Sequence, residues 1–438
     1  MKEELNGKKQ LLALKQKIRN TTVLLCQTLE NEDYVIQSSD DVSPIKWHLA
    51  HTTWFFEMFI LSKYLKDYKV FNAQFQNLFN SYYQSMNEPF PKRKRGFLSR
   101  PTVREVYEYR KQVDDHLDYL LEQGQKETKD WDKIKFLIIL GLQHEQQHQE
   151  LMLMDIKYNF SMDPSFPVYR MQPNSNRSVF ESSNNHPFTS KSSSEFSYVS
   201  GGIVNIGTDE ALFAFDNECP RHQEILNPYL IANRLVTNGE YLNFIENGGY
   251  TNPQWWLSEG REAVLKNGWN APLYWHKLDN DWHVFTLSGL RKLNLLEPVS
   301  HVSYFEADAY ARWRGYRLPK ESEWENFVKV NNIPIEHGNF LENEFYHPQQ
   351  ASRVNDLQQL FGDLWEWTSS SYSPYPGFKT LEGVLGEYNG KFMSGQMVLR
   401  GGSCATPQSH IRATYRNYYQ PDKRWQFSGI RLAKEGQE

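Results

Sequence analysis

The sequence predicts an α+β protein in which an N-terminal four-helix bundle precedes an irregular α+β domain. Apolar residues recur at helical spacing up to about residue 160, whereas short strand-like runs among Gly, Pro and Trp follow after residue 198. Between them, residues 174–197 have Ser or Asn at 13 of 24 positions, a composition typical of linkers. We therefore expect one domain at 1–173, a linker at 174–197 and a second domain at 198–438.

Composition and charge narrow the class of protein. The 438 residues exceed what one hydrophobic core commonly organises, which favours two domains. With a net charge of −5 the chain has no basic surplus for nucleic acid, and it has no apolar run long enough to span a membrane. The N-terminus lacks the apolar segment of a secretory signal, and the three scattered cysteines make no disulfide framework. We expect a cytoplasmic protein and leave open whether it forms a homo-oligomer.

Four helices are expected in the N-terminal domain. The first covers residues 8–30, and the second begins at Ser43-Pro44, with Ser as the N-cap and Pro in the first turn. The third begins near Pro101, and the fourth covers about 131–158. Four helices of this length favour an antiparallel bundle.

The second domain shows few regular elements. Strand-like runs stand at 202–206 and 397–400. Thr237 and Ser303 each have a Glu three residues later, which is the spacing of a capping box and predicts a helix start at each. We interpret the rest of this domain as ordered loops.

The sharpest local signal is a pair of histidines four residues apart, His144 and His148, on the fourth predicted helix. That spacing places both imidazoles on one face, where they can take neighbouring positions on one metal ion. On the second helix, His51 lies on the aromatic, buried side and is the expected third ligand, whereas His48 is the weaker candidate. The pattern suits Fe(II) or Zn(II), and spacing does not separate the two metals.

Two other interpretations remain open from spacing alone. The Gln-rich segment around the pair can be a solvated helix surface. The spacing His144-Glu145-x-x-His148 also matches a zinc-protease motif, whose third ligand would then be His186 or His222. Because a protease would need a substrate-binding strand in the same domain, we favour a metal site inside the bundle.

These residues resemble a known family. The run from Trp47 to His51 and the run His144-x-x-x-His148-x-Glu150 are similar to the DinB-like bundle of the iron(II)-dependent sulfoxide synthases of ergothioneine biosynthesis. The second half resembles the formylglycine-generating-enzyme-like domain of the same family, which is C-type-lectin-like. The runs that carry this second resemblance are Phe215–Glu218, Leu235–Tyr241, Arg317–Glu325, Gly362–Thr368 and Leu399–Ser403.

The resemblance implies a non-haem iron oxygenase with Fe(II) as the cofactor, bound by His51, His144 and His148. Its substrates would be hercynine (trimethylhistidine), a thiol and O2, and its product would contain a new C–S bond and a sulfoxide. Three neutral ligands would leave three positions for the two substrates and oxygen. No nucleic-acid or membrane partner is expected.

Tyr82 and Tyr83 lie in the long connection between the second and third helices, a segment in which part of the family has active-site tyrosines. A phenol is a suitable proton donor, so the resemblance predicts that one of the two is the catalytic acid. Loop packing is the alternative role, and Tyr372 or Tyr375 would then be the next candidates.

The resemblance also suggests substrate contacts. Lys92 and Arg95, within a basic run, match positions that anchor the carboxylate of the thiol, although such a run is also typical of a solvated loop. Aromatic faces near the other substrate would suit its quaternary ammonium group. The expected hercynine contacts are Gln147, Asn417, Tyr418 and Tyr419.

One departure from the family bears on the thiol. Members that use γ-glutamylcysteine can have an acidic residue where this chain has Tyr419, so free cysteine is favoured. A selenium-donor variant of the synthase, a DinB-type metal-dependent thiol transferase and a binding module with a structural metal stay open as alternatives. A formylglycine-generating oxidase would need paired cysteines near the C-terminus, where Cys404 stands alone.

Overall fold

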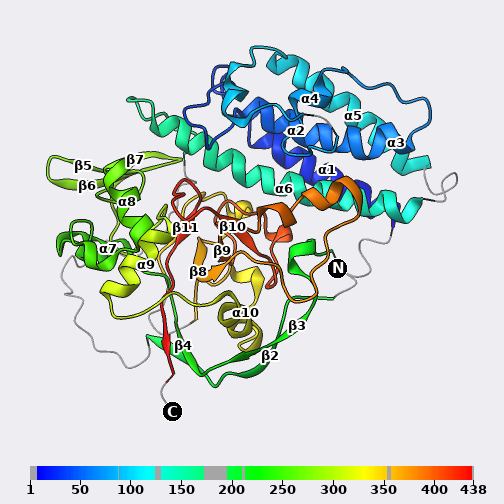
Figure 1. The fold of residues 1–438 in the computed structure, drawn as a ribbon. Coiled ribbons are helices and arrows are strands. Elements are labelled where there is room, and N and C mark those ends of the chain that lie inside the picture. Colours follow the sequence, from blue (N-terminus) through cyan, green and yellow to red (C-terminus); the bar gives the residue numbers. More distant parts are fainter. Residues whose placement is uncertain are drawn as a thin grey trace. The chain divides into compact units, whose positions relative to one another are not determined.

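The computed structural model describes residues 7–86, 88–123, 130–171, 195–209, 213–352 and 357–436. The chain divides into two compact units, one mainly helical and one mixed (Figure 1). The helical unit contains the described residues up to Tyr169 and, from the second half of the chain, those of Glu210–Asp216 and Lys379–Lys391. The mixed unit contains the others. Together they give the α+β class that the sequence predicts.

Four long helices make up most of the described part of the helical unit, and they form the predicted four-helix bundle (Figure 1). Shorter turns of helix stand in the long connection between the second and third of them. The helices are α1 (Lys8–Leu24), α2 (Ile45–Phe56), α3 (Ser62–Tyr64), α4 (Phe75–Leu78), α5 (Val103–Gln123) and α6 (Trp131–Ser161), with a π-helical turn at Glu57–Leu61 and a 3-10 turn at Lys92–Phe97.

Helix α2 is the centre of this unit, because every one of its residues is buried, polar ones included. It packs against both α5 and α6. The close approach to α6 depends on Gly141, where a Cβ atom would lie 2.6 Å from the ring of Phe56 and 2.9 Å from that of Phe55. This contact lies one helical turn before His144, so it sets the distance between the two helices at the predicted metal site.

A buried ion network joins the other helices. Glu145 of α6 accepts from Arg19 of α1 at 2.9 Å, from Thr22 at 2.6 Å, and from Arg110 of α5. Burial alone would raise the pKa of Glu145, but the two guanidinium groups and the hydrogen bonds lower it to about 2. The Glu145 carboxylate, which completes the metalloprotease spacing between His144 and His148, is therefore already bonded to α1 and α5. Its contacts hold three helices together.

The long connection after α2 packs back onto that helix. The indole N–H of Trp54 donates to the Gln76 carbonyl at 3.1 Å, and that of Trp47 donates to the Leu78 carbonyl at 3.2 Å. Buried carbonyls need such donors, since an unpaired one is costly. The connection is therefore held at defined points on the ligand-bearing helix.

Within the described residues, the mixed unit contains four small sheets instead of one large one (Figure 1). The largest has the strand order β10-β9-β8-β11, in which only the β8–β11 pair is parallel. The other sheets have the orders β1-β4-β12, β5-β6-β7 and β2-β3. The strands are β1 (Phe196–Val199), β2 (Gly202–Ile206), β3 (His222–Leu226), β4 (Tyr229–Ala232), β5 (Trp275–Leu278), β6 (Asp281–Thr286), β7 (Gly289–Lys292), β8 (Trp365–Ser371), β9 (Met397–Arg400), β10 (Asn417–Tyr419), β11 (Ser428–Gly429) and β12 (Ala433–Glu435).

Two helices of the mixed unit, α7 and α9, begin where the sequence predicts. Thr237 and Ser303 each accept from the backbone N–H of the Glu three residues later, and each Glu bonds back to the cap. Both predicted capping boxes are therefore confirmed. The helices are α7 (Asn238–Glu246), α8 (Ser258–Asn267), α9 (Tyr304–Trp313) and α10 (Glu321–Val330).

Two helix boundaries differ from the prediction. Helix α1 ends at Leu24 instead of residue 30, because the amides of Cys26 and Gln27 turn to carbonyls three residues back. The N-cap of α2 is Pro44, not Ser43. The backbone N–H of Ser43 donates instead to the carboxylate of Asp155 on α6 at 2.8 Å, so this residue joins two helices.

Most of the predicted linker at 174–197 lies outside the described residues. None of the helices in the described ranges combines the length and the apolar composition that a bilayer crossing requires.

Candidate metal centre

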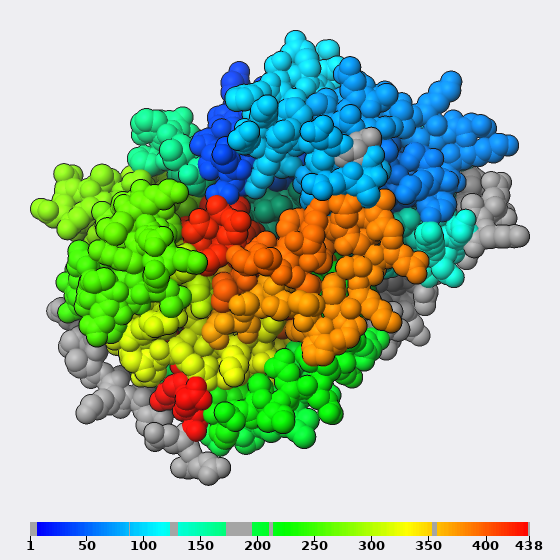
Figure 2. Space-filling view, in the orientation of Figure 1, coloured from blue at the N-terminus to red at the C-terminus, as the bar shows by residue number. Residues whose placement is uncertain are grey.

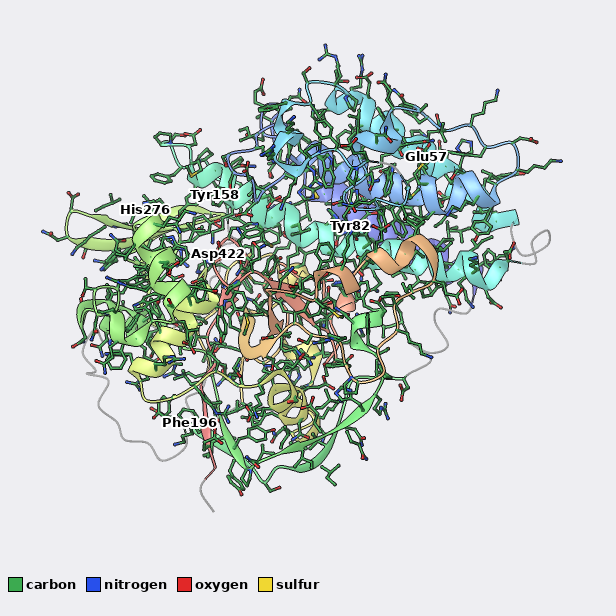
Figure 3. The ribbon with its side chains drawn as sticks, viewed as in Figure 1. Glu57, Tyr82, Tyr158, Phe196, His276 and Asp422 are labelled. Carbon is green, nitrogen blue, oxygen red and sulfur yellow. The ribbon has the colours of Figure 1, made fainter. Side chains whose placement is uncertain are left out.

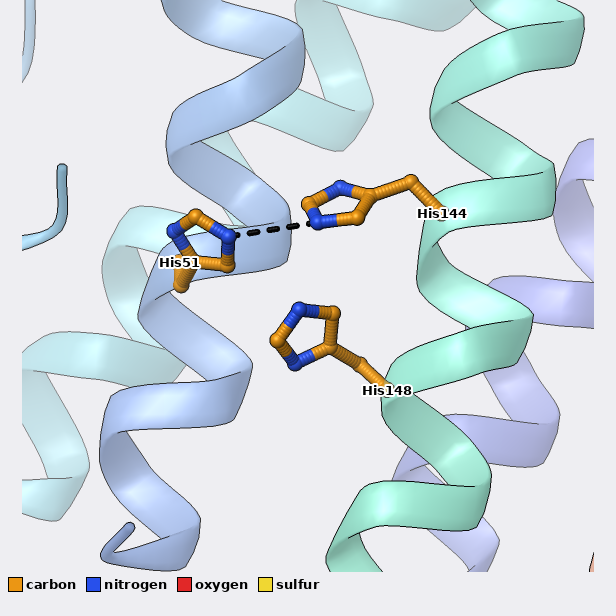
Figure 4. A group of neighbouring side chains, drawn as sticks. All are labelled: His51, His144 and His148. Atoms are coloured by element: carbon orange, nitrogen blue, oxygen red, sulfur yellow. Dashed lines mark hydrogen bonds between the residues drawn. The ribbon is translucent and has the colours of Figure 1, made fainter. Parts of the chain in front are cut away.

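Three histidines converge inside the bundle, and they are the three that the sequence predicts. His51 comes from α2, and His144 and His148 come from successive turns of α6 (Figure 4). All three are buried, and one ring nitrogen from each lies within 4.8 Å of the others. Within the described part of the chain this is the sole group of His, Cys, Asp or Glu side chains with metal-site spacing.

The ring of His51 is held on both faces and at one edge. It stacks on Trp47, with ring centroids 4.6 Å apart, and on Trp54 at 5.7 Å. Its Nδ1 lies 2.6 Å from the carbonyl oxygen of Phe79. Because a carbonyl only accepts, Nδ1 must carry the proton, and Nε2 is left with a free lone pair.

His148 is held in the same way by a second histidine. Its Nδ1 lies 2.8 Å from Nδ1 of His48, whose Nε2 lies 2.9 Å from the carboxylate of Asp155. His48 therefore uses both ring nitrogens within the protein, which explains why it is not part of the three-histidine group.

His144 completes the group from one turn earlier on α6. Its Nε2 lies 3.2 Å from Nε2 of His51, and its Nδ1 has no partner among the described residues. Since the lone pair on His51 Nε2 faces another ring nitrogen, the pair needs a proton or a metal ion between them. The donor set thus fits a cation with a preference for imidazole nitrogen.

Burial keeps these imidazoles neutral. It lowers the pKa of His144 to about 4, and it lowers the pKa values of His51 and His148 well below 6.5. Metal binding requires the deprotonated ring, so the fold supplies all three ligands in the reactive form.

The two predicted catalytic tyrosines lie one ring away from the histidines. Tyr83 is fully buried against Trp54, with centroids 5.8 Å apart, and Trp54 in turn stacks on His51. The Tyr83 hydroxyl makes no hydrogen bond within the described residues, and burial raises its pKa above the usual value. Tyr82 (labelled in Figure 3) is half-buried and packs on Tyr83 at 4.6 Å.

The structure adds a tyrosine that the sequence reasoning missed. Tyr388 lies edge-on to His144, with centroids 5.8 Å apart, and its hydroxyl donates to the side chain of Gln147. Its ring stacks on Phe215 at 5.6 Å and meets Tyr82 at 6.2 Å. Gln147, a predicted substrate contact, is therefore next to the histidines and already has an aromatic partner.

Two charged residues attach the segment that bears Tyr388. The carboxylate of Glu387 accepts from the backbone N–H groups of Gln84 and Ser85 at 3.0 Å each. Lys391 donates to the Tyr82 carbonyl and lies over the Tyr82 ring at 4.8 Å. We name residues 379–391 the strap. Its orange surface adjoins the blue and cyan surface that includes residues 82–85 (Figure 2).

The two residues predicted to bind the substrate carboxylate, Lys92 and Arg95, differ in their exposure. Lys92 is exposed. Arg95 is buried, donates to Ser43 Oγ at 2.9 Å and Ser81 Oγ at 3.2 Å, and lies 3.3 Å from the centre of the Trp47 ring. Burial lowers the pKa of Arg95 to about 9. Arg95 thus supports the indole that stacks on His51.

The remaining predicted contacts belong to the mixed unit. Asn417, Tyr418 and Tyr419 form β10 and are all half-buried. Tyr418 stacks on Tyr372 with centroids 4.0 Å apart, so its ring is fixed by a neighbour. The hydroxyl of Tyr375, the other reserve candidate, donates to Glu321 at 3.3 Å.

Comparisons with known proteins match both halves of the chain. The DinB superfamily profile matches residues 15–152, and the sulfatase-modifying factor enzyme 1-like domain matches 181–328 and 336–436. The hercynine oxygenase of Mycolicibacterium smegmatis is 30% identical over 328 residues, which cover 68% of this chain and 71% of that protein. That of Mycobacterium tuberculosis is 33% identical over 251 residues, or 53% of this chain and 58% of that protein.

A fungal protein shares the similarity. Ergothioneine biosynthesis protein 1 of Schizosaccharomyces pombe is 32% identical over 238 residues, which cover 52% of this chain and 28% of that protein. The matched lengths range from just over a quarter to less than three quarters of these relatives. Fold and site define a three-histidine bundle joined to a sulfatase-modifying-factor-like domain. The chain belongs to the family of such two-domain proteins that includes the hercynine oxygenases.

Proposed function

We propose that this protein is a non-haem iron oxygenase that joins a thiol to hercynine with O2, in ergothioneine biosynthesis. The observation that carries this proposal is the cluster of three neutral histidines, which contains no carboxylate ligand within the described residues. The relatives named hercynine oxygenase and ergothioneine biosynthesis protein 1 support the substrate and the pathway.

The proposed reaction balances without another reductant. Hercynine loses one C–H hydrogen and the thiol loses its S–H hydrogen. A C–S bond forms between the two, one oxygen atom becomes the sulfoxide, and the other leaves as water. An iron(II) ion bound by His51, His144 and His148 would supply the redox chemistry that activates O2.

Hercynine recognition would fall to polar and aromatic groups beside the histidines. Gln147 and Tyr388 are hydrogen-bonded to each other next to His144, so either can turn a donor or acceptor toward a bound imidazole or amino acid group. Asn417, Tyr418 and Tyr419 are the proposed contacts from the mixed unit, where aromatic faces would attract the quaternary ammonium.

A tyrosine hydroxyl would supply the proton that oxygen reduction consumes. We propose Tyr82 or Tyr83 for this role, since Tyr83 has a buried hydroxyl without a partner in the described residues and Tyr82 packs beside it. A neutral phenol at neutral pH has a proton to give, and burial keeps Tyr83 in that form.

Cations would anchor the thiol substrate through its carboxylate. Lys92 and Arg95 are the proposed anchors, and the buried Arg95 Nε has no partner among the described residues. We propose free cysteine ahead of γ-glutamylcysteine, because Tyr419 does not offer the acidic group that would pair with the amine of the longer thiol.

One experiment separates this function from its rivals. Purified protein is loaded with Fe(II) under nitrogen, mixed with hercynine and either cysteine or γ-glutamylcysteine, and exposed to O2. Mass spectrometry should detect a hercynine–thiol sulfoxide only when iron and O2 are both present. A metal-dependent thiol transferase would instead form adducts without O2 and with Zn(II), which would refute the oxygenase proposal.

A further inference from the structure

His48 and Asp155 have no role in the reaction described above, yet both are buried beside the metal centre. The exposed fraction of each side chain is below 5%. They connect α2 to α6 at the point where His148 lies. Buried polar groups need hydrogen-bond partners, and this contact supplies them for both side chains. Its chemistry, however, has a consequence for the ligand.

The direction of each hydrogen bond follows from Asp155. A carboxylate only accepts, and the same oxygen of Asp155 also accepts the backbone N–H of Ser43 at 2.8 Å. A neutral His48 must therefore donate through Nε2, which makes its Nδ1 an acceptor. The nitrogen that faces this acceptor is Nδ1 of His148, 2.8 Å away, so it must carry the proton. One tautomer of His148 satisfies the whole chain of contacts, and it leaves Nε2 free to bind a metal.

We propose that His48 and Asp155 act as positioning residues, which fix His148 in the tautomer and orientation that present Nε2 to the metal ion. This inference rests on the proposed metal site but not on the reaction. Hydrogen-bonded partners behind a ligand histidine fix its ring and raise its basicity, and their loss weakens metal binding about 10–100-fold. His51 has an equivalent support in the Phe79 carbonyl, whereas the support for His148 comes from a replaceable side chain.

Substitutions at His48 separate a positioning role from a space-filling one. Glutamine can donate through its amide nitrogen to Asp155 and accept through its oxygen from His148, whereas phenylalanine fills the space and does neither. We expect His48→Gln to retain most of the Fe(II) affinity and His48→Phe to lose it about 10–100-fold. Affinity is measured under nitrogen by competition with a chromophoric Fe(II) chelator.

Asp155→Asn tests the other end of the hydrogen-bond chain from Asp155 through His48 to His148, without a change of side-chain volume. The amide can donate to His48 and reverse both tautomers, which would leave Nε2 of His148 protonated and unable to bind. We expect a loss of affinity similar to that of His48→Phe, and no further loss in the double variant, because both changes break the same chain. Asn159→Ala is the matched control: Asn159 lies one turn further on α6 and bonds Ser38 at 2.6 Å, so its loss should lower stability but not Fe(II) affinity.

The outcomes distinguish the two proposals. If the wild-type protein binds Fe(II) and both His48 variants bind it equally well, the positioning role is wrong and the metal site stands. If Asn159→Ala weakens binding as much as Asp155→Asn, the network acts only through stability, which also overturns the inference. If the wild-type protein binds no Fe(II), both the inference and the proposed function fall.

Discussion

In two of the three histidines, His51 and His148, a hydrogen-bond partner on Nδ1 sets the roles of the ring nitrogens. The Phe79 carbonyl fixes His51, and the Asp155–His48 pair fixes His148. His144 has no such support on Nδ1 within the described residues. We therefore expect His144 to be the ligand whose ring has the most freedom to adjust when a metal or substrate binds.

Removing one phenol tests the proton donor. Phenylalanine keeps the ring volume at Tyr82 or Tyr83 and deletes only the hydroxyl, so folding should survive. We expect one of the two variants to lose sulfoxide product, to gain oxidation of the thiol alone to a sulfinic acid, and to retain iron. Product ratios are measured by mass spectrometry.

Tyr109→Phe is the control for this prediction. The Tyr109 hydroxyl is buried in the same unit but donates to Glu57, so its loss should not change the product ratio. If Tyr82→Phe, Tyr83→Phe and the double variant all kept the wild-type ratio, the donor would lie elsewhere.

A buried carboxyl in the mixed unit predicts how stability depends on pH. Burial raises the pKa of Asp363 from 3.8 to about 6, although Asn339 and the Gln349 amide donate to it. The folded state thus favours the protonated form. This contribution to stability is fully present below pH 3.8 and is lost as pH rises through 6. Asp363→Asn should remove the dependence, which amounts to roughly 3 kcal/mol over the whole titration.

Chemical denaturation at pH 4.5 and 7.5 measures this effect. Wild-type protein should lose stability relative to the variant as pH rises between these values. An equal difference between the two proteins at both pH values would show that the Asp363 carboxyl does not titrate between folded and unfolded states as described.

At the scale of elements, the contact between α2 and α6 controls the site. The apolar spacing of both helices was readable from the sequence, and Gly141 marks where they approach. Gly141→Ala would place a methyl 2.6 Å from Phe56 and should cost about 1–3 kcal/mol of stability by overpacking. It should also weaken Fe(II) binding, because α2 and α6 both supply ligands.

Gly239→Ala gives the comparison for this prediction. That glycine lies in α7, and its added Cβ would come no closer than 3.2 Å to any neighbour. Stability measured by urea denaturation should change by less than in Gly141→Ala. Equal losses in the two variants would mean that the α2–α6 contact does not explain the effect, because helix propensity favours Ala over Gly at both positions.

The strap is the second element that shapes the site. Glu387→Gln replaces a carboxylate that accepts two backbone N–H groups with an amide that has one acceptor oxygen. We expect faster hydrogen exchange at residues 82–86 and a weaker hold on Tyr388. Glu382→Gln, an exposed residue of the same strap, should leave exchange unchanged. Unaltered exchange in Glu387→Gln would show that the strap is held by other contacts.

At the scale of the whole molecule, the sequence predicted most of the features that depend on contacts between residues close together in the chain. The i, i+4 histidines, the aromatic helix with His51 and the two capping boxes follow from spacing, and all appear as expected. The place of Tyr388 was not predicted. Its contact with Gln147 joins residues 241 positions apart, and no nearby motif marks it. Phe215 lies in a run that resembles the family. That run predicted the fold of the second domain but no role for Phe215.

The division of the chain shows the same limit. The sequence predicts one domain over 198–438, whereas the described residues 213–216 and the strap group with the helical unit. Such returns of the chain leave no change in composition, so a reading of composition sees one continuous domain. Local sequence patterns likewise did not predict the π-helical turn or the hydrogen bond between Ser43 and Asp155.

The iron content of ligand variants tests the central claim most directly. Wild-type protein, His51→Ala, His144→Ala, His148→Ala and the control His116→Ala are loaded with Fe(II) under nitrogen, freed of excess metal and assayed for iron per chain. His116 lies on α5 and bonds only the Gln112 carbonyl of its own helix among the hydrogen bonds described. We predict one iron per chain in wild type and His116→Ala, and little or none in the other three. Stoichiometric iron in His148→Ala would contradict the account.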